Sequence, residues 1–150
     1  MTTQSTSEAS GNSAGSEPMS DGDKIATVHA ILEAWSAKDW DRVVSLFAPN
    51  GRLQSVMSEP IVGREAFAER LKILAVGLER FTYRMKAIGV IDGRVFVERV
   101  EEIAKHGHCG EVPVVSVLSV EEGLVTEWTE YFDKATMLSA VSGPPDQASA

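Results

Sequence analysis

Apolar side chains recur every three or four positions in three segments of the first half of the chain. The segments are 25–35, 40–47 and 67–78, and this spacing is typical of helices with one buried face. Ser20 or Asp21 can cap the first helix, because a side-chain oxygen there accepts a hydrogen bond from an otherwise unpaired backbone N–H. The pattern therefore predicts three helices in this half.

A turn and a short strand are predicted between the second and third helices. Residues 49–51, Pro-Asn-Gly, are a strong turn signal that should end the second helix. Residues 52–57 are expected to form a short strand, and the third helix should begin near Gly63.

From Phe81 onward the apolar period changes to two, which is typical of strands with one buried face. Four antiparallel strands are expected, from Phe81 and then over 94–103, 112–120 and 124–133, with a glycine-rich loop at 105–110. Helices followed by strands indicate an α+β fold, in which N-terminal helices pack on a curved, mostly antiparallel sheet. Such an arrangement can enclose an apolar pocket.

The composition supports one folded domain with tails. The chain has 150 residues, of which 43% are hydrophobic, so it can bury a core. Residues 1–20 and 143–150 contain no Val, Ile, Leu or aromatic side chain. We therefore expect a disordered N-terminal tail, a domain over 21–142 and a flexible C-terminal tail.

The chain is acidic, with 14 Lys and Arg against 22 Asp and Glu and a net charge of −8. It has no basic run to neutralise phosphates, so nucleic acid is not expected as a partner. No apolar stretch approaches the roughly 20 residues that span a bilayer, so no membrane interaction is expected. The single cysteine, Cys109, cannot form an intrachain disulfide, which favours a cytoplasmic location.

His106, His108 and Cys109 crowd the glycine-rich loop and are the first candidates for metal ligands. No second pair of ligands at the spacing of a zinc site accompanies them. An exposed turn is the better interpretation, and neither a metal nor another cofactor is expected.

Charged side chains occur where the strand pattern predicts buried ones. Glu130 lies between Trp128 and Phe132 on the most apolar face of the last strand, where an unpaired carboxylate is costly. Arg99 is the nearest counter-charge on a strand, and Glu101 shares its face. One guanidinium can bridge both carboxylates. Such a trio is either an acid–base device or a structural ion-pair network, and spacing alone leaves both open.

The motif Arg99-Val100-Glu101, with Glu130 in the segment 128–133, resembles the limonene-1,2-epoxide hydrolase family. That family has Arg-x-Asp on one strand and Trp-x-Asp-Tyr-Phe-Asp on a later one, and the likeness extends over about 25–140. It implies the cone-shaped α+β fold of nuclear-transport-factor-2-like proteins and ketosteroid isomerases. It also implies one-step hydrolysis of a hydrophobic, terpenoid-like epoxide to a vicinal diol, without a cofactor, by a homodimer.

By this resemblance Glu130 is the base that activates water, Glu101 the acid that protonates the epoxide oxygen, and Arg99 the bridge that orients both. Both family aspartates are glutamates here. The family holds its nucleophilic water with a Tyr and an Asn, and the corresponding positions are Leu53 and Ser55.

Phe67, Leu71, Met85 and Trp128 are expected among the walls of the substrate pocket. Two other functions remain open on the same fold. One is a ketosteroid-isomerase-like or polyketide-cyclase-like enzyme in which one carboxylate shuttles a proton. The other is a non-catalytic small-molecule-binding module whose charges are structural. A fold with so many activities cannot choose among them.

Overall fold

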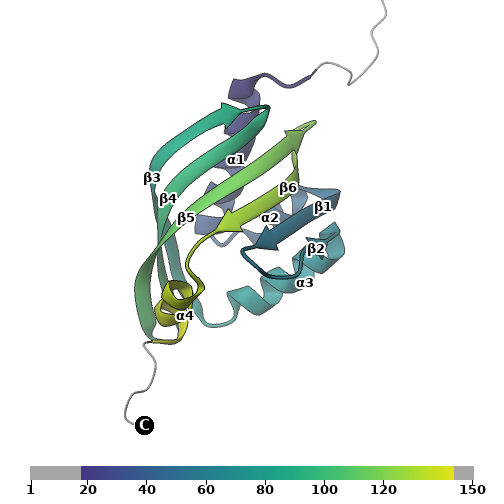
Figure 1. Ribbon diagram of the computed structural model, residues 1–150. Helices are drawn as coiled ribbons and strands as arrows, with labels where there is room; N and C mark the ends of the chain where they lie inside the picture. The colour runs from purple at the N-terminus through teal and green to yellow at the C-terminus, as the bar shows by residue number, and fades with distance from the viewer. Residues whose placement is uncertain (1–17, 144–150) are drawn as a thin grey trace, which may run out of the picture.

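In the computed structural model, which describes residues 18–143, helices pack against a curved six-stranded sheet (Figure 1). The elements follow the order α1 (Asp21–Ser36), α2 (Trp40–Ser45), β1 (Phe47–Ser55), β2 (Ile61–Val62), α3 (Arg64–Ala75), β3 (Leu78–Ile91), β4 (Arg94–Lys105), β5 (His108–Glu121), β6 (Leu124–Tyr131) and α4 (Lys134–Ser142). The predicted α+β architecture is therefore confirmed. Of the predicted tails at 1–20 and 143–150, residues 1–17 and 144–150 lie outside the described residues.

The first helix begins where the sequence indicates. The Ser20 hydroxyl accepts a hydrogen bond from the Asp23 N–H at 3.0 Å, which caps α1. Just before it, Met19 packs against the core, and its sulfur accepts a hydrogen bond from the Gly123 N–H at 3.3 Å. The end of the predicted tail nearest the domain is thus in contact with the β5–β6 hairpin.

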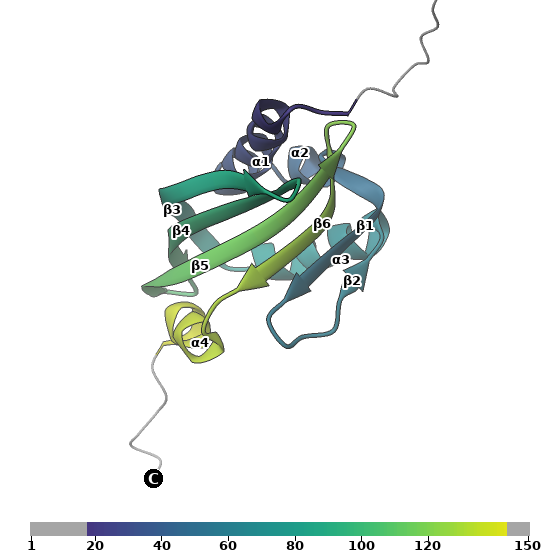
Figure 2. The same cartoon turned by 45° about the horizontal axis from the view of Figure 1, so that its top comes forward.

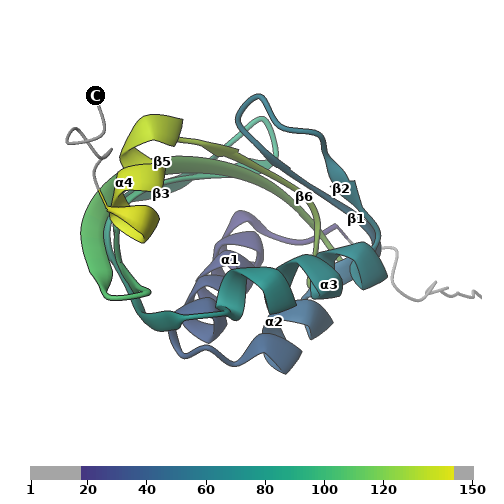
Figure 3. The same ribbon diagram turned by 90° about the horizontal axis from the view of Figure 1, so that it is seen from below.

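The strands form one sheet in the order β2-β1-β6-β5-β4-β3, antiparallel except for the parallel pair β1 and β6. Two-residue turns at 92–93, 106–107 and 122–123 join the long strands, and both residues of each turn have positive φ. Such turns match the right-handed twist of the strands they connect. The sheet curves around α1 and α3, and α4 lies against its β4–β5 end (Figures 2 and 3).

Three predicted boundaries are wrong. The turn residues 49–51 lie inside β1, where the pairing with β6 shifts register between Phe47 and Arg52, so they form an irregularity in the strand. The loop expected at 105–110 is only a two-residue turn, and β5 begins at His108. Leu78, assigned to the third helix by its spacing, begins β3.

The C-terminal helix α4 was not predicted, because its small residues give no clear apolar stripe. Asp133 caps it by accepting hydrogen bonds from the N–H and the hydroxyl of Thr136 at 2.9 and 2.7 Å. Ala140 packs directly on Gly110 of β5, where an added Cβ would lie 2.9 Å from the Ala140 Cα. A glycine in β5 thus allows the helix to close one end of the sheet.

The core has two parts. The larger lies between α1, α2, α3 and the sheet, and the smaller lies beneath α4. Within the described residues, the helices are too short or too polar to cross a bilayer.

Candidate active site

Strand alternation places Arg99 and Glu101 on the concave face of β4, together with the buried Val95 and Val97. The sheet register then brings in two further residues. Ser116 of β5 lies opposite Val97 on one side, and it lies opposite Glu130 of β6 on the other. Ser116 therefore sits between the arginine and the second glutamate.

Arg99 binds both carboxylates. Its Nε and Nη2 donate to Glu101 Oε2 at 3.1 and 2.7 Å, and Nη2 also donates to Glu130 Oε2 at 2.8 Å. Arg99 and Glu101 are buried, with side chains 1% and 6% exposed, whereas Glu130 is 20% exposed. The predicted trio is present, with one guanidinium nitrogen shared between two carboxylate oxygens.

Two further donors hold the same oxygen of Glu130. The Ser116 hydroxyl, which accepts a hydrogen bond from Arg99 Nη1 at 2.9 Å, lies 3.0 Å from Glu130 Oε2. The indole Nε1 of Trp128 lies 3.1 Å from this oxygen and 3.3 Å from the Ser116 hydroxyl. Glu130 is therefore held from three sides through a single oxygen.

Each carboxylate keeps its other oxygen free. The Oε1 atoms of Glu101 and Glu130 accept no hydrogen bond from any described residue, yet both residues line the cavity. No buried side-chain nitrogen or oxygen in the described part of the chain lacks a hydrogen-bond partner. These two Oε1 atoms are therefore accessible from the cavity, where they can meet water or a ligand.

The cavity above the trio has a volume of about 560 Å³, within the usual range of roughly 300–1,000 Å³ for small-molecule sites. Its walls come from α1, α3, the sheet and α4. The apolar lining side chains include Leu32, Trp35, Leu53, Leu74, Leu78, Phe81, Ile103, Phe132, Met137 and Val141. The trio is thus a polar patch in an apolar chamber.

Burial acts on the pKa values of Glu101 and Arg99 in opposite directions. It raises the pKa of Glu101 from 4.5 to about 7, with Arg99 opposing this shift and Glu130 adding to it. For Arg99, burial lowers the pKa, but the two carboxylates more than offset that effect and the net shift is upward. Near neutral pH, Glu101 can therefore carry a proton while Arg99 stays charged.

The family model of the SnoaL-like domain matches residues 28–128. The chain belongs to the SnoaL-like family. Its matched region includes α3, the trio residues Arg99 and Glu101, Ser116 and Trp128, and it ends two residues before Glu130. The cavity is thus built largely from the family domain.

Solved structures share the fold of this SnoaL-like domain. An LEH-like epoxide hydrolase of M. tuberculosis is 24% identical with a TM-score of 0.71, over 79% of this chain and 89% of that one. A protein of Jannaschia sp. CCS1, provisionally assigned as a SnoaL-like polyketide cyclase, is 20% identical with a TM-score of 0.72, over 91% of this chain and 99% of that one. A ketosteroid-isomerase-like protein of Catenulispora acidiphila, solved with trimethylamine, is 20% identical with a TM-score of 0.70, over 79% of this chain and 93% of that one. The predicted cone-shaped fold is confirmed.

The parallel pairing of β1 with β6 places both predicted water-positioning residues in the cavity. Leu53 lies beside Trp128, and Ser55 lies beside Glu130. Ser55 is therefore the one residue of the two that can donate a hydrogen bond to a water near Glu130.

Three predicted wall residues lie elsewhere. Phe67 and Leu71 are buried in the larger core, where the Phe67 ring stacks on Phe47 at 4.0 Å, and Met85 packs against the same core. The opposite side of α3 reaches the cavity through Arg70 and Leu74. The apolar stripe of α3 thus serves the core, and of the four predicted wall residues only Trp128 lines the cavity.

Sequence reasoning missed Ser116 and did not predict the helix α4. A signal for Ser116 was present, because it is the polar residue at the centre of five alternate β5 positions, 112 to 120, that all face inward. His106, His108 and Cys109 are exposed, and the described residues hold no group of three or more His, Cys, Asp or Glu suited to a metal ion.

Proposed function

We propose that this protein is an epoxide hydrolase that adds water to an apolar epoxide in one general acid–base step. The observation that carries the proposal is the pair of free carboxylate oxygens, each held by Arg99 through its partner oxygen, at the base of an apolar cavity. A base and an acid are thereby fixed side by side, as concerted proton transfers require.

In this mechanism Glu130 Oε1 removes a proton from water as the water oxygen attacks an epoxide carbon. The carbon–oxygen bond of the ring breaks, and Glu101 donates its proton to the departing oxygen, which becomes the second hydroxyl of the diol. The raised pKa of Glu101, about 7, lets it hold that proton at the start. Arg99 stays charged throughout, and the proton on Glu130 returns to Glu101 through water.

Hydrolysis of a terpenoid-like epoxide in oxygen-18 water tests the proposal. One labelled hydroxyl in a vicinal diol is expected. An isomerised product without label would instead indicate a ketosteroid-isomerase-like or cyclase-like activity. Binding with no turnover would indicate a small-molecule-binding module.

We also propose a homodimer through the convex face of the sheet. A shallow apolar groove crosses this face over β3, β4 and β5, lined in part by Ala87, Phe96 and Val115. Light scattering of the full chain should give twice the monomer mass, and Val115→Asp should reduce it to that of the monomer. A monomeric parent protein would refute this part.

A further inference from the structure

The charges around the cavity, apart from the trio, are mostly positive. Arg70, Lys105, Lys134 and Glu59 line it, three cations and one carboxylate, although the whole chain carries a net charge of −8. The cavity therefore gathers positive charge that the composition as a whole does not predict.

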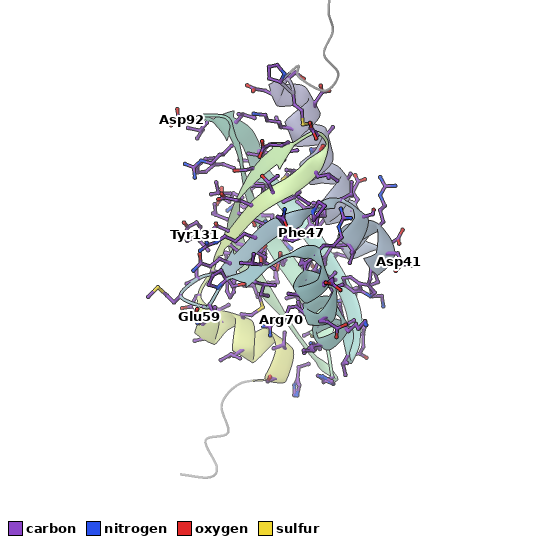
Figure 4. All side chains as sticks on the ribbon, turned by 90° about the vertical axis from the view of Figure 1, so that its right-hand side faces the viewer. Asp41, Phe47, Glu59, Arg70, Asp92 and Tyr131 are labelled. Atoms are coloured by element: carbon purple, nitrogen blue, oxygen red, sulfur yellow. The ribbon has the colours of Figure 1, made fainter. Side chains whose placement is uncertain are left out.

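The three cations come from separate elements that meet at one end of the molecule. Arg70 is on α3, Lys105 ends β4 and Lys134 begins α4. Figure 4 shows Arg70 and Glu59 near the end where α4 lies, whereas Asp92 marks the opposite end of the sheet. Arg70 and Lys134 are exposed and Lys105 is half-buried. We call these three residues the cationic rim.

Within the described residues, no acidic side chain forms an ion pair with the cationic rim. Among residues 18–143, no Asp or Glu oxygen lies within 4.0 Å of a rim nitrogen, while four other cations do have such partners. The Lys105 ammonium donates to the Leu74 carbonyl at 2.8 Å. Its pKa is lowered, first by burial and then by the charge of Arg70. An anion placed between Arg70 and Lys105 would relieve their repulsion.

Most of the cavity wall outside the rim and the trio is apolar. The apolar side chains of the same cavity include Leu74, Leu78, Met137, Leu138 and Val141. Leu138 is 61% exposed, so apolar surface continues to the mouth. A ligand that fills the cavity meets free carboxylate oxygens at the buried end and cations at the open end.

We propose that the cationic rim binds a carboxylate, so that the substrate is an apolar chain with the epoxide at one end and a carboxylate at the other. The part about the epoxide rests on the proposed function. A carboxylate suits the rim because the arginine fork can bind both of its oxygens. The apolar chain suits the walls. A neutral epoxide would leave the rim without a partner.

A binding experiment tests the rim without any turnover. The full chain is titrated by calorimetry with a medium-chain alkyl carboxylate and with the alcohol of the same chain length. The variant combines Arg70→Gln and Lys134→Gln, and it leaves Lys105 in place because that side chain holds the Leu74 carbonyl. The control is Lys72→Gln, which lies on α3, is 73% exposed and does not line the cavity.

The double variant should bind the carboxylate about three- to tenfold more weakly and the alcohol unchanged, as the loss of two exposed charge contacts predicts. Added salt should weaken the binding of the alkyl carboxylate and leave the binding of the alcohol unchanged. Equal affinity of the parent protein for both ligands, or an equal loss in the Lys72 control, would overturn the proposal.

Kinetics separate this proposal from the proposed function. A chain with a terminal epoxide and a far carboxylate is compared with its methyl ester. Diol formation with a lower KM for the acid, lost in the double variant, supports both proposals. Rim-dependent binding of the alkyl carboxylate without diol from either epoxide supports the rim and refutes hydrolysis. Diol from both epoxides with the same KM refutes the rim alone.

Discussion

Each face of the sheet carries one arginine bound to two glutamates, but the two sets have different surroundings. On the convex face Arg84 binds Glu102 at 3.2 Å and Glu111 at 2.6 Å, with side chains 57%, 36% and 56% exposed. On the concave face Arg99 binds Glu101 and Glu130 at 2.7 and 2.8 Å, with side chains 1%, 6% and 20% exposed.

The difference shows that burial, and not composition, makes the inner trio a candidate for chemistry. The outer trio is solvated, and its ion pairs are screened by water and salt. Inside, removal of water raises the pKa of Glu101 to about 7 and strengthens each interaction with Arg99. The outer trio is therefore a matched control for every test of the inner one.

The largest effect is expected from removal of the arginines. Arg99→Ala leaves two carboxylates facing each other without a counter-charge, which should lower the free energy of unfolding by about 3–5 kcal/mol and abolish activity. Arg84→Ala should change neither by much, because its partners are exposed. Urea unfolding measures the stability of both variants. Equal losses of stability would remove the distinction between the two faces of the sheet.

Replacement of the proposed base comes next. Glu130→Gln keeps the shape of the side chain and loses its basicity, so diol formation should fall by about 10²–10⁴-fold while the circular dichroism spectrum is unchanged. Glu111→Gln should retain parental turnover. Full activity of Glu130→Gln on a substrate of the parent protein would make the inner trio a structural network.

The pH dependence of the free energy of unfolding tests the protonation state of Glu101. Since folding raises its pKa from 4.5 to about 7, the folded protein binds this proton more tightly than the unfolded chain does. The free energy of unfolding should therefore fall as pH rises through this window, by at most about 1.4 kcal/mol per pH unit, and the loss should be complete above it.

The matched variants for this test are Glu101→Gln and Glu102→Gln. Glu101→Gln should remove that slope and reduce turnover, because an amide is a poor proton donor. Glu102→Gln, on the exposed face, should keep the slope. Urea midpoints at pH 5 and pH 8 give the answer, and identical slopes in all three proteins would contradict a protonated Glu101.

The smallest effect is expected at the residue that joins the inner trio to β5. Ser116→Ala removes the acceptor for Arg99 Nη1 and one donor to Glu130, which should cost about 1–3 kcal/mol of stability and lower turnover. Ser119→Ala on the same strand is the control, since the Ser119 side chain makes no hydrogen bond to a described residue. An inert Ser116→Ala would show that Arg99 and Trp128 position Glu130 without the serine.

Local pattern was sufficient for much of the fold. The three-to-four-residue period predicted α1, α2 and α3, and the period of two predicted β3 to β6. The pairing of Arg99 with Glu101 and Glu130 could also be predicted, because alternation fixes the face of each residue and an unpaired carboxylate between Trp128 and Phe132 is too costly.

Tertiary structure alone decided which apolar residues meet the ligand. Phe67 and Leu71 have the same sequence character as Leu74, yet the first two are in the core and the third lines the cavity, because the docking of α3 on the sheet sets its rotation. The role of Ser116 depends on the register of β5 between two strands.

The α4 helix and the cationic rim depend on the tertiary structure in the same way. Arg70, Lys105 and Lys134 are far apart in the chain, and the fold gathers them around one cavity. The packing of Ala140 on Gly110 holds α4, and with it Lys134, at one end of the sheet. The sequence by itself determined the chemistry available on each strand, since that depends on near neighbours. Only the fold determined its surroundings, since burial, register and helix rotation are set by contacts between distant segments.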